Sequence, residues 1–306
     1  MSAAFIAFAR ANGVEITKLD DSGKLRRCGT TDHPCSRNGA YLFDGHGGFC
    51  WAWDGEGRAI VFNDPNGRPL TGDEHARADA KRQVYRDEQI QLQRQAATWA
   101  ARMLALAKPA EHGYLQLKGL KGAQGLVLPD GELFVPMRDV RTNELLGAQI
   151  VQWLPEERRW EKKYLYGMRS KGAVLRLGPR QAAETILAEG YATSLSIEAA
   201  VRQMKLNAAV LCCFSAYNLP VAAERTTGRR YVIADHDPVQ ADPVKAKQNP
   251  GEQGQRAAIA TGLGWAMAET PGFDANDLHA THGLMAVCAL VMRARAAEPV
   301  EVAVPS

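Results

Sequence analysis

The chain has 306 residues, 46% of them hydrophobic and 23% charged, which is an ordinary composition for a soluble globular protein. Its length allows two domains, since one domain usually takes about 100–200 residues. The formal net charge of +3 suits a protein that binds polyanions but identifies no partner, so charge has to be considered locally.

Two classes of protein are excluded early. No apolar run approaches the roughly 18 residues of a membrane span, and residues 1–10 lack the charged start and apolar core of a signal peptide. Six cysteines, of which Cys212 and Cys213 are adjacent in an apolar run, do not resemble a disulfide framework. We therefore expect a cytoplasmic protein with reduced thiols and no association with membranes.

Residues 1–70 are predicted to form a small, strand-rich module. A helix from Phe5 to Asn12 is expected to end at Gly13, because glycine readily adopts the left-handed conformation that closes helices. Short apolar or aromatic runs follow, separated by turns rich in Gly, Asp and Asn. They predict antiparallel strands at residues 24–27, 40–43, 49–53 and 59–62.

The same module contains residues of the types that bind zinc. The candidate ligands are Cys28, Cys35, His46 and Cys50, near which His33 also lies. The spacing lacks the C-x-x-C knuckle of most structural zinc sites. Small buried thiols beside surface histidines are therefore the favoured interpretation, and a zinc site is the alternative.

Residues 71–110 are predicted to be a helical linker, with the helix itself at residues 74–107. Large apolar residues recur every seven positions, at Tyr85, Leu92, Trp99 and Leu106, and Ala96 and Met103 lie four residues after Leu92 and Trp99. This spacing predicts one apolar stripe. Basic side chains on the other faces alternate with acidic ones, so a solvated face is favoured over a nucleic-acid contact. The sequence Lys108-Pro109 is expected to end the helix.

Residues 111–180 are predicted to form a second strand-rich unit, with strands at 132–139 and 145–151 around a polar turn. Basic side chains flank glycines in two segments of this unit, namely Lys118 and Lys121, and further on Lys163, Arg169 and Lys171. Glycine lets the backbone approach a phosphate closely, and lysine or arginine neutralises it. Solvated loops and contacts with phosphates are both consistent with this pattern.

Residues 181–295 alternate between strands and helices, which predicts βαβ crossovers and a parallel sheet. Strands are expected at 186–189, 208–214 and 231–234, with helices at 191–204, 219–225, 254–268 and from Asp274 to Arg293. A polar insertion is expected at 237–249. Asp274 or Asn276 is either the N-cap of the last helix or a further acidic group of a site.

Two of these strands end in carboxylates. Glu189 ends the first apolar strand, and Asp235 and Asp237 follow the strand at 231–234. The carboxyl ends of strands in an open α/β sheet border the crevice where ligands bind. Three carboxylates there suit a hard divalent cation, Mg²⁺ or Mn²⁺, which prefers oxygen ligands. We expect the chemistry of the protein at these strand ends.

These motifs resemble the Toprim domain of topoisomerases, primases and certain nucleases. The resemblance is carried by an apolar strand ending in Glu189-Gly190, a helix rich in Ala, Ser and Thr, and Asp235-His236-Asp237. Upstream, residues 134–139 and 146–147 are similar to the amino-terminal subdomain of the primase catalytic core, and residues 163–165 and 171–172 to its basic segment. Residues 274–277 match a further acidic motif of that family.

The resemblance is specifically to primases of phages and plasmids. It implies an α/β fold, with a parallel-sheet Toprim domain at 181–295 preceded by an α+β primase-core subdomain at 111–180. The first module resembles the amino-terminal domain of such proteins. The resemblance implies a degenerate module similar to a zinc ribbon that binds DNA. The zinc knuckle of the bacterial replicative primases is missing. No Walker A motif occurs, so we expect no fused helicase.

The resemblance implies a DNA primase, a nucleotidyltransferase that makes short RNA primers on single-stranded DNA during phage or plasmid replication. Glu189, Asp235 and Asp237 would be its catalytic and Mg²⁺-binding residues, with Glu189 as general base or metal-positioning group. The residues expected to neutralise the ribonucleoside triphosphates or the template backbone are Arg138, Lys163, Arg169 and Lys171, with Lys118 and Lys121 in addition. A replicative helicase is the expected protein partner.

Two alternatives use the same residues differently. A Toprim nuclease or strand-passage enzyme would cut phosphodiesters with these acids, although no tyrosine stands out as the nucleophile that a topoisomerase needs. A non-catalytic DNA-binding replication factor would retain the fold alone. The complete set of three acids argues against that last hypothesis, because an unused site has no evident reason to concentrate repelling carboxylates.

Overall fold

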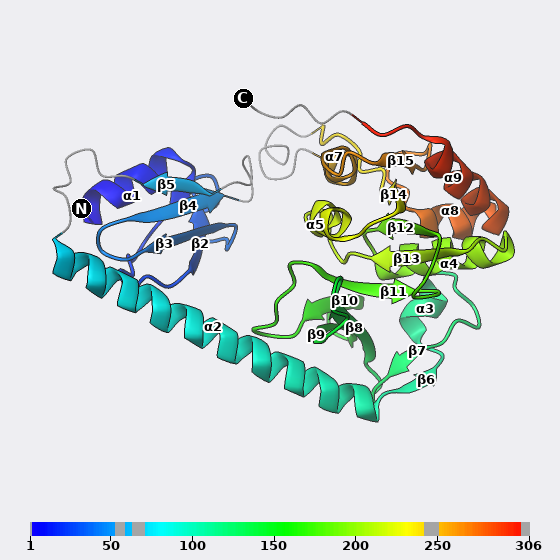
Figure 1. The fold of residues 1–306 in the computed structure, drawn as a ribbon, viewed down its shortest axis with the longest axis horizontal. Coiled ribbons are helices and arrows are strands. Elements are labelled where there is room, and N and C mark those ends of the chain that lie inside the picture. The colour runs from blue at the N-terminus through cyan, green and yellow to red at the C-terminus, as the bar shows by residue number, and fades with distance from the viewer. Residues whose placement is uncertain (1, 53–58, 63–70, 242–250, 301–306) are drawn as a thin grey trace. The chain divides into compact units, whose positions relative to one another are not determined.

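The computed structural model describes residues 2–52, 59–62, 71–241 and 251–300 (Figure 1). The chain separates into two compact units. The first contains residues 1–91 and 239–250, and the second contains residues 92–238 and 251–306. The domain limits expected at residues 70, 110 and 180 stay predictions.

The first unit contains an antiparallel sheet that packs against helix α1 (Ser2–Ala11), and also the first part of the long helix that follows. Its strands follow the chain in the order β1 to β5, at Val14–Glu15, Arg26–Thr30, Gly39–Phe43, Gly48–Ala52 and Ile60–Phe62. Every neighbouring pair is antiparallel, as the turn-separated runs of the sequence predict. The two-residue strand β1 was not predicted.

Aromatic rings of α1 and the sheet form the core of the first unit. The ring of Phe5 stacks on that of Phe43, with centroids 4.5 Å apart, and meets the edge of Phe62 at 5.4 Å. Gly13 has a φ of +79°, so the predicted left-handed residue follows α1. The amino-terminal module therefore has a hydrophobic core of its own.

Helix α2 (Gly72–Leu106) matches the predicted helix in extent but not in its buried face. Trp99 and Leu106 of the expected stripe are 43% and 56% exposed, whereas Ala96 and Ala100 are buried. The predicted stripe is therefore wrong for Trp99 and Leu106, whereas two of its smaller members fit it: Ala96 is buried, and Met103 packs against the core cluster that contains Phe134.

The second unit is built on one ten-stranded mixed sheet, ordered β10-β9-β8-β11-β13-β12-β14-β15, with β6 and β7 attached beside β8. The antiparallel part contains β6 (Lys108–Ala110), β7 (Gly125–Val127), β8 (Leu133–Asp139), β9 (Leu145–Leu154) and β10 (Arg159–Tyr164). The parallel part contains β12 (Glu184–Ala188), β13 (Ala208–Cys212), β14 (Arg229–Ala234) and β15 (Gly264–Met267). Strand β11 (Ala173–Leu177) pairs antiparallel with both β8 and β13 and so joins the two parts.

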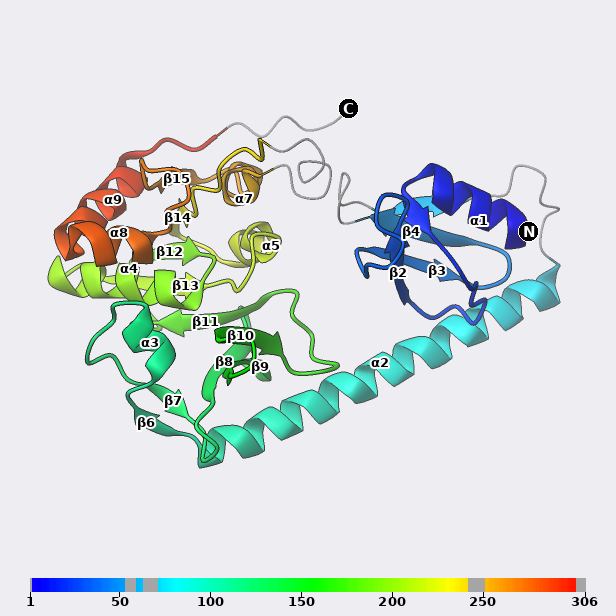
Figure 2. The same cartoon turned by 180° about the vertical axis from the view of Figure 1, so that it is seen from behind.

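Helices cover both faces of the parallel part (Figures 1 and 2). One face carries α4 (Tyr191–Gln203), α8 (Ala275–His282) and α9 (Leu284–Ala296), and the other carries α5 (Asn218–Arg225) and α7 (Gln253–Ala260). The short helix α3 (Gly113–Leu117) packs on the antiparallel part. This arrangement is an α/β fold, as expected.

Two predicted helices are shorter than expected. The helix predicted at 254–268 ends at Ala260, because Gly262 turns with a φ of +67° and the chain continues as strand β15. The last helix is interrupted at Gly283, whose φ is +79°, and becomes α8 and α9. Most of the polar insertion expected at 237–249 lies outside the described residues.

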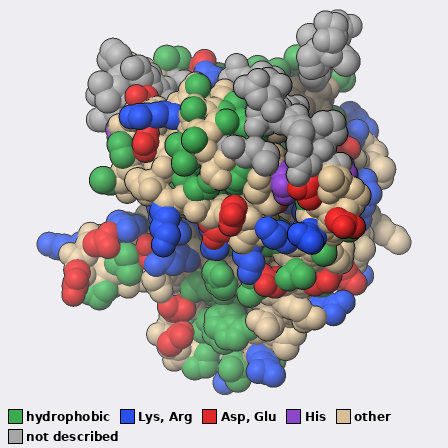
Figure 3. Space-filling view, turned by 90° about the vertical axis from the view of Figure 1, so that its left-hand side faces the viewer, with side chains coloured by type: hydrophobic (Ala, Val, Ile, Leu, Met, Phe, Trp, Pro, Cys, Tyr) green, Lys and Arg blue, Asp and Glu red, His purple; other side chains and the backbone are tan. Residues whose placement is uncertain are grey.

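Surface charge is mixed. On the face in Figure 3, basic and acidic side chains are interspersed with apolar ones, so the small net charge does not collect into one large field there. Over the described ranges, no helix combines the length and apolar character needed to cross a bilayer.

Candidate functional site

Acidic side chains follow the carboxyl ends of two neighbouring parallel strands. Strands β12 and β14 pair directly, with Ala188 opposite Ile233. Glu189 comes immediately after β12, and Asp235 immediately after β14, so both lie at the same edge of the sheet. This edge is where open α/β sheets bind ligands.

The backbone around Glu189 is fixed by the neighbouring strand. The Cys213 N–H donates to the Ala188 carbonyl at 2.8 Å, and the Phe214 N–H donates to the Glu189 carbonyl at 2.7 Å. These bonds extend the pairing of β12 and β13 past the last ladder pair. Glu189 is therefore held at a rigid strand end rather than on a free loop.

The Glu189 carboxyl lies in a negative environment. Burial raises its pKa above the ordinary glutamate value, and repulsion from Asp237 raises the pKa further. The Ala216 backbone N–H and the Lys162 ammonium act in the opposite direction. The side chain is thus poised to hold a proton or to associate with a cation.

The carboxyl pKa of Asp235 is shifted strongly upward. Its pKa rises to about 8, first because the side chain is buried and then because Glu189 lies nearby, with Asp274, Asp237 and Asp277 adding repulsion. Within the described structure its buried Oδ1 has no hydrogen-bond partner. Leaving such an oxygen unsatisfied costs roughly 1–3 kcal/mol, so the site favours a proton or a cation at this atom.

Asp237 is tied to the start of helix α7. Its Oδ2 accepts a hydrogen bond from the Gly254 N–H at 2.8 Å, and its carbonyl accepts one from the Gln255 Nε2 at 2.7 Å. An added Cβ on Gly254 would lie 2.5 Å from the Asp235 carbonyl oxygen. The glycine therefore lets α7 approach the two aspartates closely.

Asp274 is the N-cap of α8, which confirms the capping interpretation. Its side chain accepts hydrogen bonds from the N–H groups of Asn276 and Asp277, and Asp277 bonds back to the Asp274 N–H at 3.1 Å. The Thr193 Oγ1 donates to its other oxygen, Oδ2, at 3.0 Å. Asp274 also acts on Asp235 as a nearby negative charge.

The donor chemistry of this cluster fits a hard cation. Its carboxylate oxygens are the ligands that Mg²⁺ prefers, and the unpartnered Oδ1 of Asp235 is a buried polar atom that such an ion would satisfy. In the part of the chain that the structure describes, however, no group of three or more His, Cys, Asp or Glu side chains is arranged to hold a metal ion. Binding of Mg²⁺ or Mn²⁺ by Glu189, Asp235 and Asp237 therefore stays a prediction.

Two of the predicted phosphate-binding residues have carboxylate partners. The Lys163 Nζ lies 2.6 Å from the Glu161 carboxylate. The Arg169 Nη2 lies 2.5 Å from the buried Asp139 carboxylate. The structure brings neither residue to the acidic cluster, and their proposed role in substrate binding stays a prediction.

The other four predicted basic residues do not gather at one site. The Lys118 Nζ is 3.9 Å from the Asp277 carboxylate, at the border of the acidic cluster. Lys121 is exposed, and Lys171 lines a separate hollow. The Arg138 Nη1 donates to a turn carbonyl at 3.1 Å.

Strand β10 brings a different lysine, Lys162, to the acids. Successive side chains of a strand point to opposite faces, so Lys162 and Tyr164 share a face and Lys163 points away. The Tyr164 hydroxyl donates to the Phe214 carbonyl at 2.8 Å, and the Lys162 Nζ lies 5.1 Å from the Tyr114 ring centroid. The sequence places Lys162 in the basic segment, but the predicted phosphate-binding residue was Lys163 instead, although the two-residue period of the strand would have distinguished the two lysines.

An open hollow of about 340 Å³ lies beside the loop that follows β13. Its polar and aromatic lining includes Tyr164, Ser170, Lys171, Ser215 and Tyr217. Tyr217 is 62% exposed, which leaves its ring free to stack on a planar group. The hollow thus offers an aromatic surface and a cation. Its lining residue Ser215 directly follows Phe214, whose backbone N–H bonds the Glu189 carbonyl.

The zinc candidates of the amino-terminal module differ widely in burial: Cys50 is buried, Cys28 is intermediate and Cys35 is exposed. Burial raises the pKa of both Cys28 and Cys50 to about 11, which disfavours the thiolate that zinc requires. The four candidates do not form a metal-binding group within the described ranges. Zinc binding stays a prediction, although the buried His46 Nδ1 has no partner there.

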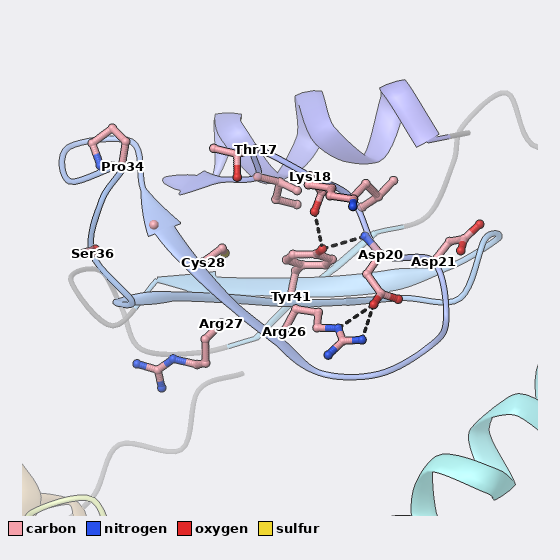
Figure 4. A pocket seen from close by; sticks show the side chains of 13 residues that line it. Thr17, Lys18, Asp20, Asp21, Arg26, Arg27, Cys28, Pro34, Ser36 and Tyr41 are labelled. Carbon is pink, nitrogen blue, oxygen red and sulfur yellow. Dashed lines mark hydrogen bonds and ion pairs between the residues drawn. The ribbon is translucent and has the colours of Figure 1, made fainter.

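Cys28 instead lines a wide hollow of about 720 Å³ on this module (Figure 4). The Tyr41 hydroxyl donates to the Lys18 carbonyl and accepts from the Asp20 N–H, while Arg26 pairs with the Asp20 carboxylate. The polar groups at this end of the hollow are therefore engaged with one another.

Comparisons with known proteins find similarity to solved structures only, at a low level. No family model and no curated protein matches the chain. A solved structure of the bacteriophage T7 lagging-strand DNA polymerase interacting with primase domains of two gp4 subunits, bound to an RNA/DNA hybrid and dTTP, is similar at 16% identity and a TM-score of 0.35. The similarity covers 60% of this chain and 86% of that chain. At this level, function has to be argued from the residues of the site.

Proposed function

We propose that the protein is a Toprim-type DNA primase that joins ribonucleotides on single-stranded DNA. The observation that carries this proposal is the carboxylate cluster at the ends of β12 and β14. There Asp235 has a pKa of about 8 and a buried oxygen without a partner in the described structure. Such a concentration of repelling carboxylates destabilises the fold unless it serves a charged ligand.

Glu189, Asp235 and Asp237 would hold Mg²⁺ or Mn²⁺. When bound, the ion supplies positive charge that stabilises the transferring phosphoryl group. Asp235 gives up its proton on going to this state, since a nearby positive charge favours the ionised carboxyl. Glu189, whose pKa is raised without the ion, would either position the ion or accept a proton from the attacking hydroxyl.

Residues outside the acidic cluster would bind the nucleotide. Lys162, which acts electrostatically on Glu189, would neutralise the triphosphate, and Lys171 would contribute from the adjacent hollow. The exposed ring of Tyr217 would stack on a base. The resemblance to phage and plasmid primases adds single-stranded DNA and a replicative helicase as proposed partners.

A priming assay tests the proposal. Purified protein is supplied with labelled ribonucleoside triphosphates, Mg²⁺ and a panel of single-stranded DNA templates. We expect short RNA products, reduced roughly 100-fold or more by Asp235→Asn, because an electrostatic group at the reacting phosphate typically contributes that much. Glu224→Gln, which changes an exposed carboxylate on α5, is the matched control and should retain the activity.

Three outcomes would overturn the proposal. The first is a lack of primers on every template. The second is an Asp235→Asn variant as active as the wild type. The third is metal-dependent nicking of plasmid DNA without nucleotides, which would assign the acids to a nuclease. Salt-sensitive DNA binding that survives replacement of all three acids, with no product formed, would identify a non-catalytic replication factor.

A further inference from the structure

A second hollow of the same unit, about 260 Å³ in volume, lies between the β8–β9 turn and strand β11. It is rich in guanidinium groups, which come from Arg138, Arg141, Arg176 and Arg180. Asp139 is the only acidic residue among its described lining residues. The hollow is therefore strongly cationic.

Asp139 does not balance these arginines, because its oxygens are already engaged. Its Oδ1 accepts hydrogen bonds from the N–H groups of Arg141 and Thr142, each at 2.9 Å. Its Oδ2 accepts one from the Arg169 Nη2 at 2.5 Å. The one carboxylate of the hollow thus closes a turn and pairs with a fifth arginine.

The four arginines lack carboxylate partners among the described residues. Among the described residues, the Arg138 guanidinium donates one hydrogen bond, from Nη1 to the Asn143 carbonyl at 3.1 Å, and most of its N–H groups remain available. Arg176 is partly buried, and both burial and its neighbour Arg180 lower the pKa of its guanidinium. Like charges held together in this way repel, and a bound anion would relieve that repulsion.

The hollow is separate from the carboxylate site. Arg138 lies opposite Val174 in the β8–β11 pair, and Arg176 lies opposite Leu211 in the β11–β13 pair. Val174 and Leu211 belong to the core beneath α5 and α7. Strand β11 runs antiparallel to β13, so Arg176 and the residues after it lead toward the amino ends of the parallel strands, whereas Glu189 and Asp235 follow the carboxyl ends of β12 and β14.

We propose that this hollow binds the backbone phosphates of single-stranded nucleic acid without reading base sequence. The planar guanidinium matches two phosphate oxygens at once. None of the described lining residues is aromatic, so the hollow offers no ring on which a base would stack. Its volume also lies below the roughly 300 Å³ of typical small-molecule pockets, which fits phosphate groups better than a whole nucleotide.

The salt dependence of binding tests this assignment. Fluorescence anisotropy is measured with a labelled thymidine oligonucleotide over a range of NaCl concentrations, in EDTA and without nucleotides. The test variant combines Arg141→Gln and Arg180→Gln, both at exposed positions where folding is not at risk. The matched control combines Arg159→Gln and Arg202→Gln, which remove the same charge from arginines paired with glutamates.

The test variant should bind roughly tenfold more weakly at low salt. The slope of log K against log salt should become shallower by about 1.4, because each lost phosphate contact on a single strand contributes about 0.7. The control should keep the wild-type slope. A test variant with the wild-type slope, or a control that loses as much, would make the inference wrong.

Inorganic tripolyphosphate distinguishes a polynucleotide from a free phosphate chain as the ligand. If Arg141→Gln/Arg180→Gln abolishes binding of tripolyphosphate but leaves oligonucleotide binding unchanged, the assignment to a nucleic-acid backbone is wrong. Because binding is measured without metal or nucleotides, it does not depend on the proposed primase activity. Arginine-dependent binding by a protein that makes no primers would overturn the proposed function and leave this inference standing.

Discussion

At the scale of single residues, Asp235 combines features that a structural carboxylate normally lacks. It is largely buried, one of its oxygens has no hydrogen-bond partner among the described residues, and several other carboxylates repel it. Buried polar groups are usually satisfied, and buried charges are usually paired. Such a residue lowers the stability of the fold at any pH at which it has to be ionised.

The raised pKa of Asp235 makes the stability of the folded protein depend on pH. The pKa of Asp235 is about 8 in the folded protein, against the ordinary aspartate value of 3.8. Between these values the folded state holds a proton that the unfolded state releases, so stability falls as the pH rises from about 4 to 8. Asp235→Asn should therefore stabilise the protein at about pH 8.5, by up to about 5 kcal/mol, and much less at about pH 5.

Urea unfolding in EDTA at the two pH values provides the measurement, and Glu224→Gln at an exposed site provides the control. Added Mg²⁺ should narrow the gap between wild type and variant, because an ion bound to the folded site stabilises it. A variant that is less stable than wild type at the higher pH would contradict this account of Asp235.

The residues of the carboxylate site were predictable to the extent that they belong to local motifs. Glu189 and Asp235 each end an apolar run, which is visible in the sequence. Arg141 and Arg176 were not singled out, because they meet only through the antiparallel pairing of β8 with β11. Pairing between distant segments leaves no local signal in a single sequence.

At the scale of elements, the start of helix α7 sets the position of the aspartates. The Gly254 N–H bonds the Asp237 carboxylate, and a Cβ at Gly254 would lie 2.5 Å from the Asp235 carbonyl oxygen and 3.1 Å from its nitrogen. Backbone atoms at such distances cannot give way cheaply. Gly254→Ala should therefore lower stability by about 1–3 kcal/mol.

Chemical denaturation would measure this loss. Gly72→Ala is the matched control, because an added Cβ at Gly72 meets no atom within 4 Å at the start of α2. That variant should stay within about 0.5 kcal/mol of wild type. Equal stability of the two variants would show that the start of α7 has room to move.

The elements themselves were predicted best where the periodicity was strong. Strands β12 and β14 and helix α4 lie close to their expected positions. Strand β15 was missed because its short run follows a helical pattern, and only the turn at Gly262 separates the two. A single glycine inside an apolar pattern is compatible with a helix, a bulge or a stop, so sequence alone left this choice open.

At the scale of the whole molecule, the two compact units have separate hydrophobic cores. Phe43 is fully buried among aromatic residues of the first unit, and Ile186 is fully buried in the parallel sheet of the second. Every residue of these two clusters comes from its own unit. The carboxylate site and the arginine hollow both belong to the second unit.

Because each core is complete within its unit, we expect two unfolding transitions that respond to different substitutions. Phe43→Ala should lower the transition of the first unit by about 3–5 kcal/mol, and Ile186→Ala that of the second by about 2–5 kcal/mol. Differential scanning calorimetry of the full chain would record both, and each variant is the control for the other. If either substitution shifted both transitions equally, the units would unfold as one cooperative body, and changes in the amino-terminal module would then act on the carboxylate site through global stability.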